Sequence, residues 1–150
     1  MITANQVADF FLAFAKEHGD FISQLKLQKM VYYADAWFLV NNDTALIEDN
    51  FEAWVHGPVV RSLYNRFKGY RWNPILDDVN SPELDANVIE HLTEIYSVFG
   101  GYSGFELEQM THNEEPWLEA RGECAPDEAC ENIINKETMR TFYTSVAEGA

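Results

Sequence analysis

Positive charge is scarce in this sequence: its 150 residues include 10 Lys and Arg side chains against 25 Asp and Glu, a formal net charge of −15. A nucleic-acid binder needs clustered Lys and Arg to neutralise phosphates, so this balance argues against direct nucleic-acid binding. The same deficit argues against peripheral binding to anionic membranes. The charge remains compatible with basic proteins as partners.

Cysteine is rare, and long apolar runs are missing. Cys124 and Cys130 are the two thiols, and their C-x5-C spacing is neither a zinc knuckle nor a disulfide framework. No apolar run approaches the ~18–20 residues of a membrane span, and the first residues lack the basic and apolar regions of a signal peptide. We therefore expect a cytoplasmic protein with reduced thiols.

Motifs for catalysis are also missing. No histidine pair has metal-ligand spacing, and there is no nucleophile elbow, phosphate-binding loop or dinucleotide fingerprint. A metal-assisted hydrolase stays open as an alternative, because His112, Glu114, Glu115, Cys124 and Cys130 are side-chain types that suit zinc. The sequence otherwise favours no enzymatic activity, no metal and no cofactor.

Apolar residues, in contrast, are plentiful enough for a core. They make up 47% of the chain, and its length suits one domain over residues 1–150. A capping box at Thr3–Gln6 followed by apolar residues at helical spacing predicts a first helix, and further apolar stripes predict helices along the rest of the chain. Two short apolar segments around a polar turn predict a small β-hairpin near residues 45–55. The expected fold is a mainly α-helical bundle with one hairpin.

The negative charge is unevenly distributed. Residues 1–75 contain 7 basic and 8 acidic side chains, a net of −1, whereas residues 76–150 contain 3 basic and 17 acidic side chains, a net of −14. The acidic half can serve solubility alone, or it can attract a basic partner and accelerate association.

Aromatic and basic side chains gather in the first half. They either pack in the core or form a binding surface, since Tyr, Trp and Arg are enriched at binding hot spots. Leu27 and Val31 belong to the inner face of the second predicted helix, and Tyr33 and Trp37 lie about 100° away from it, which predicts an exposed edge. The candidate contact residues of this edge are Lys26, Lys29, Tyr33, Trp37, Trp54, His56, Arg61 and Tyr64.

A second candidate surface is the elbow formed by residues 112–117. His112 and Trp117 are its candidate partner-binding residues, with acidic side chains beside them. The alternative is that Pro116 and Trp117 shape the packing of the elbow, and that Gly57-Pro58 shapes the entry of a helix.

Three blocks of this sequence, in matching order and separation, resemble the Panacea domain, the SocA-like antitoxin family. The blocks are Leu25–Ala34 (LKLQKMVYYA), Phe51–Val60 (FEAWVHGPVV) and Thr111–Arg121 (THNEEPWLEAR), and the resemblance covers residues 1–147. The acidic loop between Cys124 and Cys130 departs from it.

The resemblance implies a mainly α-helical antitoxin of a type II toxin–antitoxin system. Such a protein binds a cognate toxin, commonly a translation inhibitor encoded by an adjacent gene, and no catalytic residue carries over. It also implies a host protease or chaperone as a further partner, because some relatives deliver their toxin to a protease. A phage- or prophage-encoded regulator of a host protein, or an acidic mimic of nucleic acid, remains an alternative.

Overall fold

The computed structural model describes residues 1–149, and this part of the chain is mainly helical with one two-stranded antiparallel sheet. The predicted fold class is therefore confirmed. In chain order the elements are α1 (Ala4–Glu17), α2 (Gln24–Asn42), β1 (Glu52–Trp54), β2 (Gly57–Val59), α3 (Arg61–Phe67), the 3-10 helix η1 (Lys68–Tyr70), α4 (Ala86–Phe99), α5 (Gly104–His112), α6 (Glu115–Arg121) and α7 (Lys136–Gly149).

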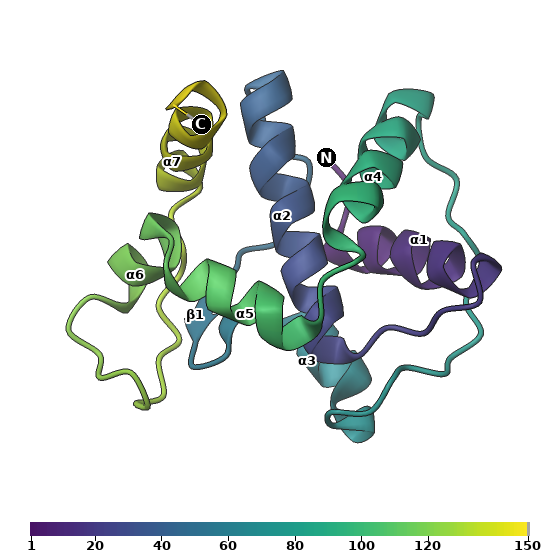
Figure 1. Cartoon of the computed structure of the whole chain (residues 1–150), viewed down its shortest axis with the longest axis horizontal. Coiled ribbons are helices and arrows are strands. Elements are labelled where there is room, and N and C mark those ends of the chain that lie inside the picture. The colour runs from purple at the N-terminus through teal and green to yellow at the C-terminus, as the bar shows by residue number, and fades with distance from the viewer. Residues whose placement is uncertain (150) are drawn as a thin grey trace.

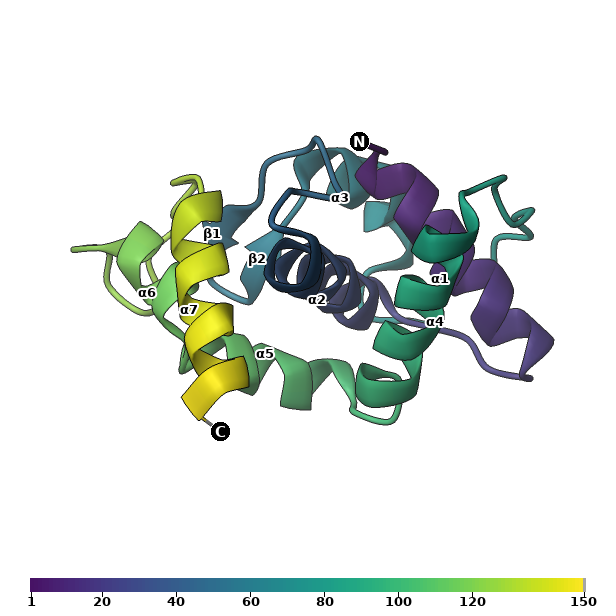
Figure 2. The ribbon, with the colours of Figure 1, turned by 90° about the horizontal axis from the view of Figure 1, so that it is seen from above.

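Helix α2 forms the centre of the molecule. Seen end-on, it is surrounded by the other helices and the hairpin (Figures 1 and 2). Residues 27–36 of this helix are all buried, and they include the charged side chains of Lys29 and Asp35. An amphipathic helix on a surface keeps one polar face in water, whereas α2 is enclosed along most of its length.

The first and last helices both begin at a side-chain cap, and the first of these is the predicted capping box. The Thr3 hydroxyl accepts a hydrogen bond from the backbone N–H of Gln6, and the Gln6 side chain accepts one from the backbone N–H of Thr3. Asn135 caps α7 by accepting a hydrogen bond from the backbone N–H of Thr138 at 3.0 Å. Both caps satisfy backbone donors that a helix start leaves without intrahelical partners.

The hairpin lies further along the chain than residues 45–55. Trp54 pairs with Gly57, so Val55 and His56 form the turn. Gly57 has a φ of +107°, a conformation that glycine adopts readily and other residues avoid. Pro58 lies in β2 and does not open the next helix, which begins at Arg61. The glycine-proline pair therefore serves the hairpin, and its interpretation as a helix entry was wrong.

Residues 45–47, the expected first strand, have different partners. They lie beside Ile2, and the buried carboxylate of Asp35 accepts hydrogen bonds from the backbone N–H groups of Leu46 and Ile47 at 2.9 and 3.0 Å. Lys136 forms an ion pair with the same carboxylate at 2.9 Å. A buried carboxylate needs such partners, and this need holds the segment against α2.

The outer edge of β1 pairs with residues 132–134. The Ala53 N–H donates to the Asn132 carbonyl, and the Ile134 N–H donates to the Phe51 carbonyl, each at 2.8 Å. This pairing joins the C-terminal part of the chain to the hairpin. Among residues 1–149, no helix combines the length and apolar character that a membrane crossing requires.

Candidate functional site

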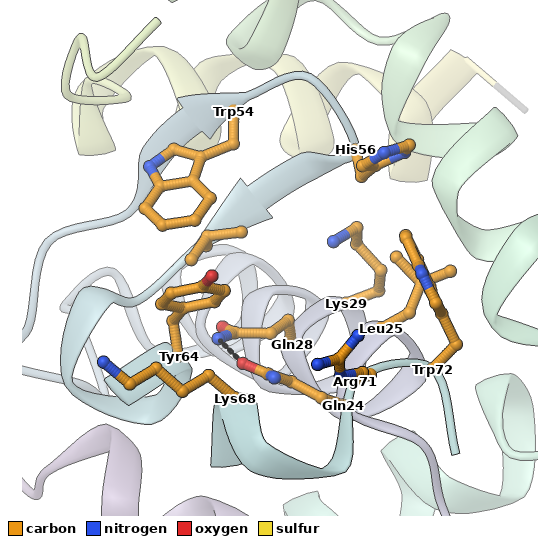
Figure 3. Close-up of a pocket in the computed structure, with 11 residues that line it drawn as sticks. Gln24, Leu25, Gln28, Lys29, Trp54, His56, Tyr64, Lys68, Arg71 and Trp72 are labelled. Atoms are coloured by element: carbon orange, nitrogen blue, oxygen red, sulfur yellow. Dashed lines mark hydrogen bonds between the residues drawn. The ribbon is translucent and has the colours of Figure 1, made fainter. Parts of the chain in front are cut away.

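A cleft of about 540 Å³ opens between the first turns of α2, the hairpin, α3 and η1 (Figure 3). Trp54 and Tyr64 lie on one side with ring centroids 4.8 Å apart, and His56 and Trp72 lie on the other at 5.2 Å. The cleft is large enough for a small ligand or for a few side chains of a partner. Its lining residues are Gln24, Leu25, Gln28, Lys29, Trp54, His56, Val59, Tyr64, Lys68, Arg71 and Trp72.

Lys29 forms the deepest charged part of the cleft. Its side chain is fully buried, and its Nζ donates a hydrogen bond to the Pro58 carbonyl at 3.2 Å. Burial lowers the pKa of this amine to about 7, although the negative charge of Glu108 acts in the opposite direction. Gly57 makes room for the lysine, because a Cβ at this position would lie 2.4 Å from Lys29 Cε.

Gln28, which lines the cleft from α2, connects α2 to the start of α3. Its side-chain amide accepts a hydrogen bond from the Val60 N–H at 2.9 Å and donates one to the Val60 carbonyl at 3.2 Å. The same amide nitrogen reaches Gln24 (Figure 3). These reciprocal bonds fix the start of α3 against α2, so the rings on the hairpin and on α3 keep a defined separation.

Arg61 lies outside the cleft and forms an exposed ion-pair network. Its guanidinium donates two hydrogen bonds to Glu52, at 3.1 and 2.7 Å, and lies 3.0 Å from a carboxylate oxygen of Glu131. It also lies over the Trp54 ring at 5.4 Å. The arginine thus orients one of the two rings on that side of the cleft.

The elbow at 112–117 packs against the hairpin. The rings of His112 and Trp117 stack at 4.2 Å, and the Trp117 indole N–H donates to the Trp54 carbonyl at 2.8 Å. Arg121, also buried, donates to the Ala53 carbonyl at 3.0 Å. The elbow therefore supports the hairpin through these contacts. Trp117 is only 6% exposed, so little of its ring is available to a partner.

Glu114 joins three elements through tyrosine hydroxyls. Its carboxylate accepts hydrogen bonds from Tyr33 at 2.7 Å and Tyr143 at 2.8 Å, and the hydroxyl of Tyr143 is hydrogen-bonded to that of Tyr32 at 3.1 Å. Burial raises the pKa of Glu114, and the two hydroxyl donors oppose that rise. Tyr33 also stacks on Phe99 with centroids 4.4 Å apart.

Replacing Tyr33 with phenylalanine should lower the free energy of unfolding by about 1.5–3 kcal/mol, the range for a hydrogen bond to a charged acceptor. The ring would keep its stack on Phe99, so urea denaturation would report the lost hydroxyl. Tyr70→Phe is the control, because the Tyr70 hydroxyl bonds to Asp77 at an exposed site. Equal losses in the two variants would contradict this role of Glu114.

The candidate contact residues of the predicted edge lie at several separate places in the structure. Lys29, Trp54, His56 and Tyr64 meet at the cleft. Tyr33 is 1% exposed and Lys29 is fully buried, so the predicted exposure is wrong for both. The reason is that α2 is surrounded on all sides and has no edge at these positions.

The remaining residues of that edge lie apart from the cleft. Lys26 donates to the Gly100 carbonyl at 2.6 Å, on the side of α2 that faces α4 and α5. Trp37, half-buried beside Tyr143, lines a separate cavity of about 270 Å³ with His91. Helical spacing placed these side chains on one helix but could not show which neighbours cover them.

The sequence analysis missed Lys68, Arg71 and Trp72, which complete the cleft. They belong to the run Arg66–Trp72 (RFKGYRW), in which basic and aromatic residues are dense. That composition is the signal in the sequence that could have identified them, because aromatic and arginine side chains are enriched at binding hot spots.

The histidine, cysteines and carboxylates considered for zinc have other surroundings. Among residues 1–149, no three His, Cys, Asp or Glu side chains converge to hold a metal ion. His112 is stacked on Trp117, and Glu114 accepts its tyrosine hydrogen bonds. The two thiols are free, with Cys130 buried.

Comparison with known proteins gives the class to which this architecture belongs. The chain is a member of the SocA-like antitoxin family, because the family model "Antitoxin SocA-like, Panacea domain" matches residues 27–118. That span runs from α2 to α6 and includes most of the cleft and the elbow.

One curated relative has a more specific description. Antitoxin SocA from Caulobacter vibrioides (strain NA1000 / CB15N) is 29% identical over 129 residues, which cover 77% of this chain and 69% of that protein. No solved structure matches the chain significantly.

Proposed function

We propose that this chain is the antitoxin of a type II toxin–antitoxin system and that it neutralises a protein toxin by direct binding in the cytoplasm. Family membership and the similarity to Antitoxin SocA support this role. The cleft favours binding at this place, because its rim exposes tyrosine, tryptophan and arginine side chains, the types enriched at binding hot spots. We expect the toxin to be encoded by an adjacent gene.

The charge distribution supports the same proposal. Residues 76–150 have a net charge of −14, and three glutamates line a shallow cavity beside α7: Glu115, Glu119 and Glu137. A toxin that acts on RNA or on the ribosome needs basic surface. Such a surface would be attracted to this half of the antitoxin, and the association would slow as salt screens the charges.

Co-expression tests the proposal. The product of the adjacent gene, expressed alone, should arrest growth and translation, and expression of this chain should restore both. The two proteins should also co-purify after size exclusion. If no adjacent gene product is toxic, or if the toxic product does not bind this chain, the proposed function is wrong.

The lifetime of the toxin identifies the mode of neutralisation. Occlusion by direct contact leaves the toxin long-lived in the complex. If neutralisation instead shortens the half-life of the toxin and requires a host protease, the chain is a proteolytic adaptor. A pulse-chase measurement in cells with and without each cytoplasmic protease separates the two modes.

A further inference from the structure

Two of the three Lys and Arg side chains that line the cleft differ from the others in the molecule. In residues 1–149, Lys68 and Arg71 are the two of the ten Lys and Arg side chains that make no hydrogen bond or ion pair with the protein, and both line the cleft. Each of the other eight bonds to a carboxylate or a backbone carbonyl. These eight are Lys16, Lys26, Lys29, Arg61, Arg66, Arg121, Lys136 and Arg140.

Carboxylates are absent from the lining of the cleft. The whole chain has 25 Asp and Glu residues, yet none lines it among the described residues. The cavity beside α7 has the opposite character, since glutamates line it. Two cations without acidic partners in an otherwise acidic molecule form a local positive site, and a ligand with a carboxylate complements it.

The backbone holds one of these cations in an unfavourable conformation. Arg71 has a φ of +55° and a ψ of −120°, a region that residues other than glycine rarely adopt. Trp72 follows it and is 65% exposed, with its ring edge-on to His56. The turn thus presents a cation and a large ring together, on the side of the cleft opposite Trp54 and Tyr64 (Figure 3).

We propose that the cleft binds an acidic segment of the toxin. An Asp or Glu side chain of that segment pairs with Arg71, Lys68 adds to the positive charge of the cleft, and a neighbouring aromatic or apolar side chain lies between the two pairs of rings. This inference rests on the proposed function and adds the chemistry of the partner. A nucleic-acid strand fits less well, because the surrounding molecule has a net charge of −15 and repels an extended polyanion.

The two charged regions then have separate roles. The acidic half attracts the basic surface of the toxin, and the cleft accepts its acidic segment. An interface with both signs of charge defines one orientation, since any rotated arrangement places like charges together.

Arg71→Gly is the main test, measured as the affinity for the toxin from the adjacent gene. Glycine tolerates the backbone at this position, so the variant should resist denaturant at least as well as the wild type. Toxin binding should nevertheless weaken at least tenfold. Arg71→Glu should weaken it further, whereas Lys16→Glu, an equal change of charge far along α1, should leave the affinity within threefold of the wild type.

The possible outcomes separate the two proposals. If the wild type binds the toxin but Arg71→Gly and Arg71→Glu bind as tightly as Lys16→Glu, the inference about the cleft is wrong and the proposed function stands. If the wild type does not bind the toxin, the proposed function fails. If the wild type binds millimolar AMP and Arg71→Gly does not, while both bind the toxin equally, the cleft accepts a nucleotide and the acidic segment is overturned.

Discussion

Substituting Gly57 by alanine should lower the free energy of unfolding by about 2–3 kcal/mol, a substantial part of the ~5–15 kcal/mol of an ordinary domain. The φ of +107° at this position disfavours any side chain. The new Cβ would also lie 2.4 Å from Lys29 Cε and 3.0 Å from Thr111 Oγ1. Lys29 is buried, and moving its side chain away from the new Cβ would break the hydrogen bond from its Nζ to the Pro58 carbonyl.

Urea denaturation of Gly57→Ala and Gly69→Ala would check this expectation. Gly69 has no positive φ, and nothing lies within 4 Å of a Cβ built there, so its substitution should change stability by less than ~0.5 kcal/mol. The double variant Gly57→Ala/Lys29→Ala no longer has the clash between the new Cβ and Lys29, but it keeps the unfavourable backbone conformation at residue 57. If Gly57→Ala were as stable as Gly69→Ala, the tight approach of the hairpin to α2 would be wrong.

Raising the pH from about 7.5 to about 9 should stabilise the fold by an amount approaching ~1.4 kcal/mol per pH unit. Burial lowers the pKa of Lys29 to about 7, while lysine in the unfolded chain titrates near 10.5. Between these values the unfolded chain binds more protons than the folded protein, so stability rises with pH and is lost as the pH falls toward 7.

The measurement is chemical denaturation across this range for the wild type and Lys29→Met. The methionine variant should show a flat profile, while Lys16→Met, which removes an exposed lysine, should keep the slope of the wild type. Measurements stop near pH 9 because burial raises the pKa of Tyr32 and Tyr143, which opposes the trend at higher pH. Parallel profiles for the wild type and Lys29→Met would contradict the burial of a titrating amine.

Local patterns predicted the helices well and the hairpin less well. The capping box at Thr3 and the cap at Asn135 act over three residues, so they can be recognised in a sequence. The position of the hairpin depends on Asp35, which binds residues 46–47 from a distant helix and removes them from the expected strand. A contact between residues so far apart in the chain cannot be recognised from a local sequence pattern.

The candidate site was predicted in composition but not in arrangement. Trp54, His56 and Tyr64 were selected as aromatic and cationic residues near Gly57-Pro58, and the structure brings them together with Lys29. Tyr33 has the same chemical character, but it packs on Phe99 in the core. Residue type and helical spacing cannot distinguish the two, because exposure depends on which helices surround α2.

The sequence by itself determined the helical class, the resemblance to SocA-like antitoxins, and the scarcity of positive charge that points to protein partners. Only the tertiary structure showed where the few cations lie. Within residues 1–149, eight of the ten have partners in the protein, and Lys68 and Arg71 are left at a cleft without carboxylates. The physical reason is that composition fixes the number of charges, whereas ion pairing depends on distances between residues far apart in the chain.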